Sequence, residues 1–164
     1  MTLAMIAFTL LVTYLTVTAR RYGLPKMVSD TYYQLGQRGW IFSLTMVMVA
    51  VMMMISIFDT EKGIQCLAFM GCSGLCFVGM APNYIDKDEY KIHKGGAMVA
   101  ALGCVGWALS VNVWPTVVTA IVYLLYLVIS YSLSLSTKLY VWYIAEIAGF
   151  TIVFATYFLL YIIK

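Results

Sequence analysis

The sequence predicts an all-α integral membrane protein, in which six transmembrane helices form a compact bundle with both termini on the non-cytoplasmic side. Of its 164 residues, 63% are hydrophobic and 10% are charged, whereas an average soluble domain has about 25% charged residues. Apolar runs of about 20 residues, each long enough to cross a hydrocarbon layer of about 30 Å as a helix, recur along the chain. A membrane β-barrel needs segments that alternate apolar and polar residues, and runs such as "MVMVAVMMMISIF" do not alternate. Residues 1–164 are therefore expected to form a single integral membrane domain.

The apolar runs define six predicted spans. They cover residues 1–19, 39–58, 63–81, 95–114, 115–136 and 140–163. The first run lacks the basic start and the small-residue cleavage site of a secretory signal, and Arg20 and Arg21 follow it directly. We therefore expect it to be retained as a helix.

The distribution of lysine and arginine predicts the orientation of the bundle. With six spans, eight of the ten basic residues fall on one side, namely Arg20, Arg21, Lys26, Arg38, Lys87, Lys91, Lys94 and Lys138. Short loops rich in Lys and Arg stay in the cytoplasm, so both termini are expected outside and the two longer loops inside. We expect the protein to reside in a bacterial inner membrane. The short connections on the outer side make the helices that they join antiparallel neighbours.

The loop after the first span, "RRYGLPKMVSDTYYQLGQRGW", carries a helix-start signal. The side chain of Ser29 or Asp30 can accept a hydrogen bond from the free N–H groups of the following turn, which predicts a short interfacial helix over residues 31–35. Aromatic residues such as Tyr32 and Trp40 are expected to anchor the loop at the level of the lipid headgroups. Asp30 has a second interpretation, as a member of a polar cluster with the second cytoplasmic loop.

The third and fourth spans are rich in small residues. Their stretches "GCSGLCFVG" and "GGAMVAALGCVG" allow close approach of the two backbones. Gly96, Ala100 and Gly103 form one small-residue face, which we expect to pack within the chain, although a face for self-association would look the same. All four cysteines lie in these two spans, where free cysteine behaves as a small hydrophobic residue. We therefore expect neither a disulfide framework nor a sulfur-based metal site.

The second cytoplasmic loop, "APNYIDKDEYKIHKGGA", contains the single histidine of the chain, His93. Acidic residues from Asp86 onward alternate with lysines, so that much of the charge can pair locally and contribute little. His93 can nevertheless be functional, because a histidine with a reference pKa of about 6.5 changes charge near neutral pH.

Glu146 lies in the last span, within "YVWYIAEIAGF", where a carboxylate is costly unless it faces a cavity or a partner. At 1.5 Å per residue, it is about 9 Å along the helix from Tyr140. That depth lies in the inner leaflet, within reach of a long basic side chain or of His93. Tyr143 shares a helix face with Glu146. Two interpretations stay open, a functional or packing-critical polar site and a carboxylate that snorkels to the interface.

Motifs for catalysis and metal binding are scarce. One histidine cannot supply the paired ligands of an intramembrane haem or the three histidines of a ceramidase-type zinc site. The acidic residues near His93 lack the spacing of an EF-hand loop. The sequence therefore predicts no catalytic residues, no metal site and no cofactor.

Two stretches, "SDTYYQLG" and "FVGMAPNYIDKDEYKIHKGGA", resemble segments of an uncharacterised group of short six-helix bacterial membrane proteins. Members of that group carry a "TYY" segment, a "G-x-AP" helix end and a histidine at the start of the next helix. The resemblance covers most of the chain and implies no activity. It marks Pro82 and His93 as defining positions.

Taken together, these features predict a non-enzymatic protein that binds a lipid, a small amphipathic ligand or a membrane partner at an inner-leaflet polar cluster. The candidate residues of this cluster are Glu146, His93, Asp30, Asp86, Tyr143 and Ser29. One alternative is a small transporter or proton-linked channel that uses Glu146 and His93 as titrating groups. A second alternative is a lipid-modifying enzyme with His93 and Asp86 as acid and base. The expected partners are membrane lipids, with a membrane protein or a second copy of the chain as a further option, and no nucleic acid.

Overall fold

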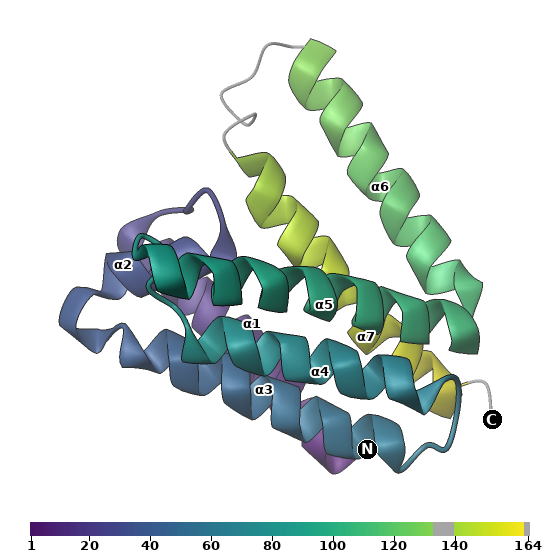
Figure 1. The fold of residues 1–164 in the computed structure, drawn as a ribbon. Coiled ribbons are helices and arrows are strands. Elements are labelled where there is room, and N and C mark those ends of the chain that lie inside the picture. The colour runs from purple at the N-terminus through teal and green to yellow at the C-terminus, as the bar shows by residue number, and fades with distance from the viewer. Residues whose placement is uncertain (133–139, 163–164) are drawn as a thin grey trace.

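The computed structural model describes residues 1–132 and 140–162, and every element in this part of the chain is helical (Figure 1). The helices are α1 (Thr2–Tyr22), α2 (Thr31–Leu35), α3 (Trp40–Phe58), α4 (Gln65–Met80), α5 (Lys87–Val111), α6 (Val113–Ser132) and α7 (Val141–Ile162). Single 3-10 turns at Val28–Asp30 and Gly36–Arg38 flank α2. The all-α prediction is confirmed for the described residues. The last part of the predicted fifth span, 133–136, and Lys138 lie outside them.

Five of the helices, α1, α3, α5, α6 and α7, are long and apolar enough to cross a membrane. α4 is apolar but has only 16 residues, which at 1.5 Å each span about 24 Å. Its boundaries have local causes. Gly63, just before α4, has a φ of 69°, a left-handed conformation that glycine adopts without strain. At the other end, Pro82 disfavours the helical conformation for Ala81, whose φ and ψ are −119° and 63°.

α5 begins at Lys87, eight residues before the apolar run that defines the fourth predicted span. Its N-cap is Asp86, whose carboxylate accepts a hydrogen bond from the backbone N–H of Asp88 at 2.9 Å. A cap determines where a helix starts, whereas hydropathy marks only where its sequence becomes apolar. α6 similarly begins at Val113, two residues before the prediction, and a single residue, Asn112, separates it from α5.

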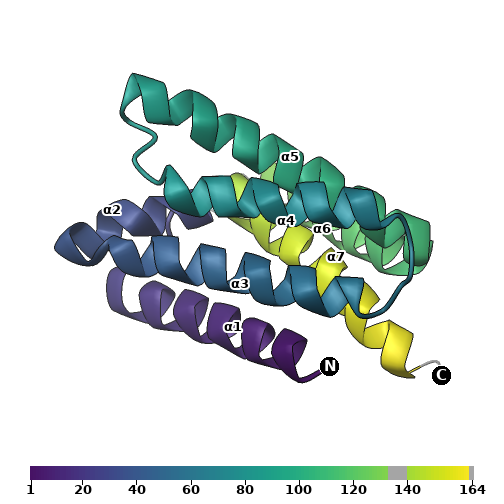
Figure 2. The same ribbon diagram turned by 60° about the horizontal axis from the view of Figure 1, so that its bottom comes forward.

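α1, α3, α4 and α5 follow one another as neighbours, and α7 crosses behind them (Figure 2). α7 also reaches α1, since the rings of Phe8 and Phe154 lie 5.3 Å apart. α6 leans away from the other helices in Figure 1 and buries little of its surface. The start of α1 and the end of α7 lie at the same end of the bundle (Figure 2). We refer to the opposite end, which carries α2 and residues 81–86, as the loop end.

The tightest helix pair is α4 and α5, whose backbones touch through glycines. A Cβ atom on Gly74 would lie 2.4 Å from the backbone nitrogen of Ala100, and one on Gly103 would lie 2.5 Å from the nitrogen of Gly71. Gly96 meets α4 in the same way, with the Gly74 carbonyl oxygen 2.9 Å from its ideal Cβ position. The small residues therefore pack within the chain, as the sequence predicts.

The contact of Gly74 with α5 can be tested by Gly74→Ala, with Gly95→Ala as the control. Both changes gain similar helix propensity, but a Cβ on Gly95 meets nothing within 4 Å. We expect Gly74→Ala to lower the free energy of unfolding by about 1–3 kcal/mol, because overpacking forces the backbones apart. Gly95→Ala should be neutral or stabilising. Unfolding in mixed micelles, followed by far-UV circular dichroism, measures both; equal stability of the two variants would contradict the packing described.

Candidate functional site

At the loop end, the carboxylate of Asp30 joins the first loop to the second. Its Oδ2 accepts a hydrogen bond from the backbone N–H of Met27 at 3.1 Å, and its Oδ1 accepts one from the hydroxyl of Tyr84. The predicted helix over residues 31–35 is confirmed as α2. The predicted capping role of Asp30 is wrong, because its carboxylate turns back toward Met27. The N–H group of Thr31, in the following turn, is bonded instead to the backbone carbonyls of the preceding 3-10 turn.

Glu146 connects α7 to the first loop. Its Oε2 accepts a hydrogen bond from the backbone N–H of Val28 at 2.5 Å, and Val28 is only 3% exposed. Among the described residues no lysine, arginine or histidine side chain bonds to Glu146. Glu146 is therefore bonded to a peptide N–H group and not to the described basic side chains that the sequence places within its reach. Lys138, which is also within that reach, lies outside the described residues.

Two tyrosines complete the inner side of this site. The Thr31 hydroxyl donates to the Val28 carbonyl at 2.6 Å. Its single proton is used there, so the hydroxyl of Tyr14, 2.5 Å away, donates to Thr31. Tyr143 is buried, and its hydroxyl lies near enough to Glu146 and to Tyr14 for electrostatic interaction.

Tyr84 is the member of the site that the sequence does not reveal. Its ring packs edge-to-face on Tyr33, with centroids 5.0 Å apart, and lies 5.2 Å from the ring of His93. Burial, together with the neighbouring Asp30 carboxylate, raises the pKa of Tyr84 well above its ordinary value, so the hydroxyl stays a donor. The chain has 13 tyrosines, and no local pattern distinguishes this one.

His93 closes the end of α4 and does not meet Glu146. Its Nδ1 lies 2.9 Å from the carbonyl oxygen of Ala81. A carbonyl can only accept, so Nδ1 carries the proton and the ring donates. Within the described residues no hydrogen bond or ion pair joins His93 to Glu146, and the histidine approaches the polar site only through the ring of Tyr84.

The structure brings together only some of the six residues that the sequence predicts for an inner-leaflet polar cluster. It brings together Asp30, Glu146 and Tyr143, with Ser29 buried beside them. Asp86 caps α5, and its side chain accepts from backbone N–H groups of its own helix. We call the set Tyr14, Val28, Asp30, Thr31, Tyr84, Tyr143 and Glu146 the polar cluster.

The polar cluster contains two carboxylates and no bonded cation within the described residues. Asp30 and Glu146 are close enough for their charges to interact. Their hydrogen bonds come from peptide N–H groups and a tyrosine hydroxyl, which are suited to hold loops together. In the described part of the chain no three His, Cys, Asp or Glu residues are placed to hold a metal ion.

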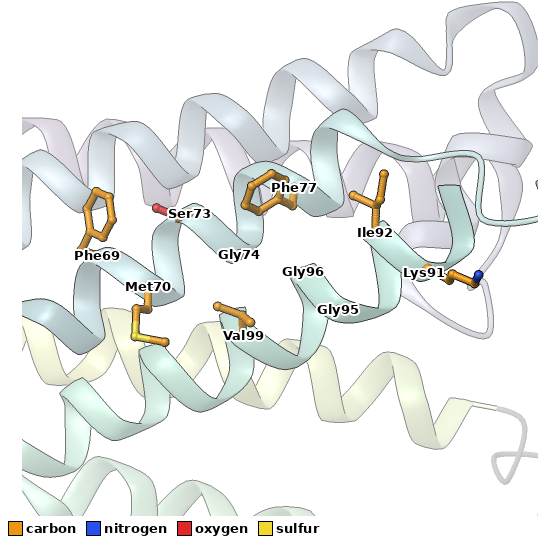
Figure 3. Close-up of a pocket in the computed structure, with 10 residues that line it drawn as sticks. All are labelled: Phe69, Met70, Ser73, Gly74, Phe77, Lys91, Ile92, Gly95, Gly96 and Val99. Atoms are coloured by element: carbon orange, nitrogen blue, oxygen red, sulfur yellow. The ribbon is translucent and has the colours of Figure 1, made fainter. Parts of the chain in front are cut away.

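An open groove runs along α4 and α5 beside the loop end (Figure 3). It has a volume of about 410 Å³ and is lined almost entirely by apolar atoms. Gly74 and Gly96 lie where the two helices meet, with Phe77 and Val99 alongside (Figure 3). Lys91 is the one charged residue among the described residues of its lining, and it lies at the loop end. We call this the α4–α5 groove.

The chain matches no family model, no curated protein and no solved structure. A functional proposal therefore depends on the chemistry of the polar cluster and of the grooves beside it.

The bond between Glu146 and Val28 predicts different effects for two substitutions. Glu146→Gln keeps an oxygen that can accept from the Val28 N–H, so we expect a loss of less than about 1 kcal/mol in the free energy of unfolding. Glu146→Leu leaves that buried N–H without a partner and should cost about 1–3 kcal/mol. Unfolding in mixed micelles measures both values. A leucine variant as stable as the wild type would show that the bond does not hold α7 to the first loop.

Proposed function

We propose that this chain is a non-enzymatic integral membrane protein that binds an anionic lipid in the α4–α5 groove. The observation that carries the proposal is the combination of an apolar groove with a single lysine at its loop end. A phospholipid has the complementary form, with an acyl chain for the groove and a phosphate for the lysine.

The size and lining of the groove support an acyl chain as its occupant. Its volume of about 410 Å³ falls within the range of about 300–1,000 Å³ that is common for small-molecule sites. Phe69, Phe77 and Val99 line it with apolar surface. Gly95, which faces it, has no atom within 4 Å of its ideal Cβ position, so helix packing does not require a glycine there.

The charge of Lys91 supports a phosphate as the headgroup. The side chain is exposed, and no acidic side chain among the described residues forms an ion pair with it. A lysine near a membrane surface contributes about 1 kcal/mol to the attraction of anionic lipid, and its long stem can lie along apolar surface while the amine stays in the headgroup layer.

The proposed orientation places this groove in the cytoplasmic leaflet. Eight of the ten lysines and arginines fall in the two longer loops and the last connection that the sequence predicts. In the structure Arg20 and Arg21 lie in the last turn of α1, and Lys87, Lys91 and Lys94 lie in the first turns of α5. Positively charged loops stay in the cytoplasm, and both termini would then face outward. In this arrangement the chain is an inner-membrane protein of a bacterium, and Lys91 meets the leaflet whose anionic lipids attract it.

The polar cluster has a positioning role in this proposal. Tyr84 ties the second loop to Asp30, and Glu146 ties the first loop to α7. The second loop leads directly into α5, which carries Lys91. The cluster therefore holds the lysine at the end of the groove.

A proton-linked transporter is the second candidate, and the electrostatic interaction between Asp30 and Glu146, which have no bonded cation among the described residues, favours it. A nearby like charge favours the neutral, protonated form of a carboxyl group. His93 contributes less to this candidate than the sequence indicates, since its Nδ1 proton is donated to Ala81.

The proposed lipid site predicts that charge and space in the α4–α5 groove control affinity for phosphatidylglycerol. Lys91→Gln should weaken binding about fivefold, the equivalent of about 1 kcal/mol, whereas Lys87→Gln, which is outside the groove lining, should change it little. Gly95→Leu should fill the groove and weaken binding at least as much. Gly149→Leu is its control, because a Cβ there also meets nothing within 4 Å. Native mass spectrometry of the protein released from nanodiscs measures the affinities.

Equal affinities for Gly95→Leu and Gly149→Leu would remove the α4–α5 groove as the binding site. If Lys87→Gln weakens the affinity for phosphatidylglycerol as much as Lys91→Gln does, the effect of Lys91 is one of general surface charge and not of the groove.

The two candidate functions differ in flux. The lipid-binding proposal predicts that proteoliposomes acidify no faster than protein-free liposomes under a pH gradient, measured with an enclosed pH-sensitive dye. Proton flux in the wild type that Glu146→Gln abolishes would replace lipid binding by proton-linked transport. Flux that Glu146→Gln leaves unchanged would indicate a leak that does not involve the polar cluster.

A further inference from the structure

A second groove lies on the other side of α4, between α3 and α4, and we call it the α3–α4 groove. It has a volume of about 650 Å³. Its lining includes Tyr32, Trp40, Leu44, Val47, Met80 and Glu89. Tyr32 and Trp40 belong to α2 and to the first turn of α3, so the polar and aromatic part lies at the loop end and the aliphatic part extends along the helices.

The charge of this groove is opposite to that of the α4–α5 groove. Glu89 is the one charged residue among the described residues that line it. Glu89 and Lys91 are two positions apart on α5, and residues at that spacing point to different sides of a helix. The first turns of α5 thus place Glu89 on one groove and Lys91 at the loop end of the other.

The Glu89 carboxylate is held in place by one hydrogen bond and can accept more. Its Oε2 accepts a hydrogen bond from the backbone N–H of Asn83 at 2.9 Å, and none of the described lysines or arginines forms an ion pair with it. His93 and Tyr33 both interact with it electrostatically. An ionised carboxylate offers about four acceptor positions on its two oxygens, so an incoming donor finds free ones.

Aromatic rings lie on the same groove as the carboxylate. Trp40 is 61% exposed, so its ring is accessible to a ligand in the groove. Tyr32 packs edge-to-face against Phe42, with ring centroids 6.5 Å apart. Tryptophan and tyrosine faces attract ammonium groups, and a carboxylate adds a charge-assisted hydrogen bond.

We propose that the α3–α4 groove binds an amphiphile with an ammonium head, whose head lies between Glu89 and Trp40 and whose chain lies along Leu44, Val47 and Met80. The charge of the groove excludes the anionic lipid assigned to the α4–α5 groove, so this is a separate site with a separate ligand class. Such an ammonium group occurs in phosphatidylethanolamine and in free cationic amphiphiles.

The test measures binding of two probes to the full chain, phosphatidylethanolamine in nanodiscs and dodecyltrimethylammonium in maltoside micelles. The variants are Glu89→Gln and Trp40→Leu. Glu89→Gln keeps an oxygen for the Asn83 N–H, so the loop is preserved. Two further variants serve as controls. Asp88→Asn, the control for Glu89→Gln, removes an exposed charge outside the groove lining. Trp142→Leu, the control for Trp40→Leu, removes a tryptophan on α7 that is 68% exposed.

We expect Glu89→Gln and Trp40→Leu each to weaken binding about fivefold, with both controls unchanged. Loss for both probes supports a site for ammonium amphiphiles in general, and loss for phosphatidylethanolamine alone supports a lipid headgroup as the source. The proposal is overturned if Glu89→Gln and Asp88→Asn have equal effects or if neither probe responds to either variant. Lys91→Gln should leave phosphatidylethanolamine binding unchanged, so failure of one groove does not decide the other.

Discussion

The close backbone contact between α4 and α5 is the constraint on which the rest of the structure depends. Gly71 and Gly74 on α4 meet Gly96 and Gly103 on α5 at distances that leave no room for a Cβ atom. In a membrane, helices gain little from the hydrophobic effect, and packing of small residues provides much of the association energy. This contact fixes α5 along α4, and thereby places the first turns of α5 beside the grooves on either side of α4.

The polar cluster holds the two loops at the loop end in place through hydrogen bonds. Carboxylates in or near a membrane normally need a cation, but in the described residues Asp30 and Glu146 are stabilised by peptide N–H groups and a tyrosine hydroxyl. The Glu146–Val28 and Tyr84–Asp30 bonds each join the first loop to a distant segment, whereas the bond between Asp30 and Met27 is local. The loop end is therefore ordered by polar contacts, while the helices below it are ordered by glycine and aliphatic packing.

Two residues of one turn of α5 give the two grooves opposite charges. Glu89 and Lys91 belong to the same alternating sequence, which by itself indicates local pairing of opposite charges. Helical geometry separates them to different sides of α5, and each becomes the single charge among the described lining residues of its groove. In the two binding proposals, the charged residue of each groove sets which headgroup is accepted.

The sequence by itself determined the helices, since their causes are local. Apolar length predicts the long helices, and small residues at spacings of four and three predict the α4–α5 contact. A helix-start signal at Ser29 or Asp30 predicts the position of α2 correctly, although no side chain caps that helix. α5 and α6 begin before the predicted spans, because hydropathy does not detect caps such as Asp86. Only the tertiary structure decided the partners in the polar cluster. Glu146 and Val28 are 118 positions apart, and Tyr84 and Asp30 are 54 apart. Any carboxylate, histidine or tyrosine at the loop end has several chemically suitable partners, and the relative placement of α1, α5 and α7 selects among them. His93 therefore bonds to the end of α4, and Glu146 bonds to a peptide N–H group.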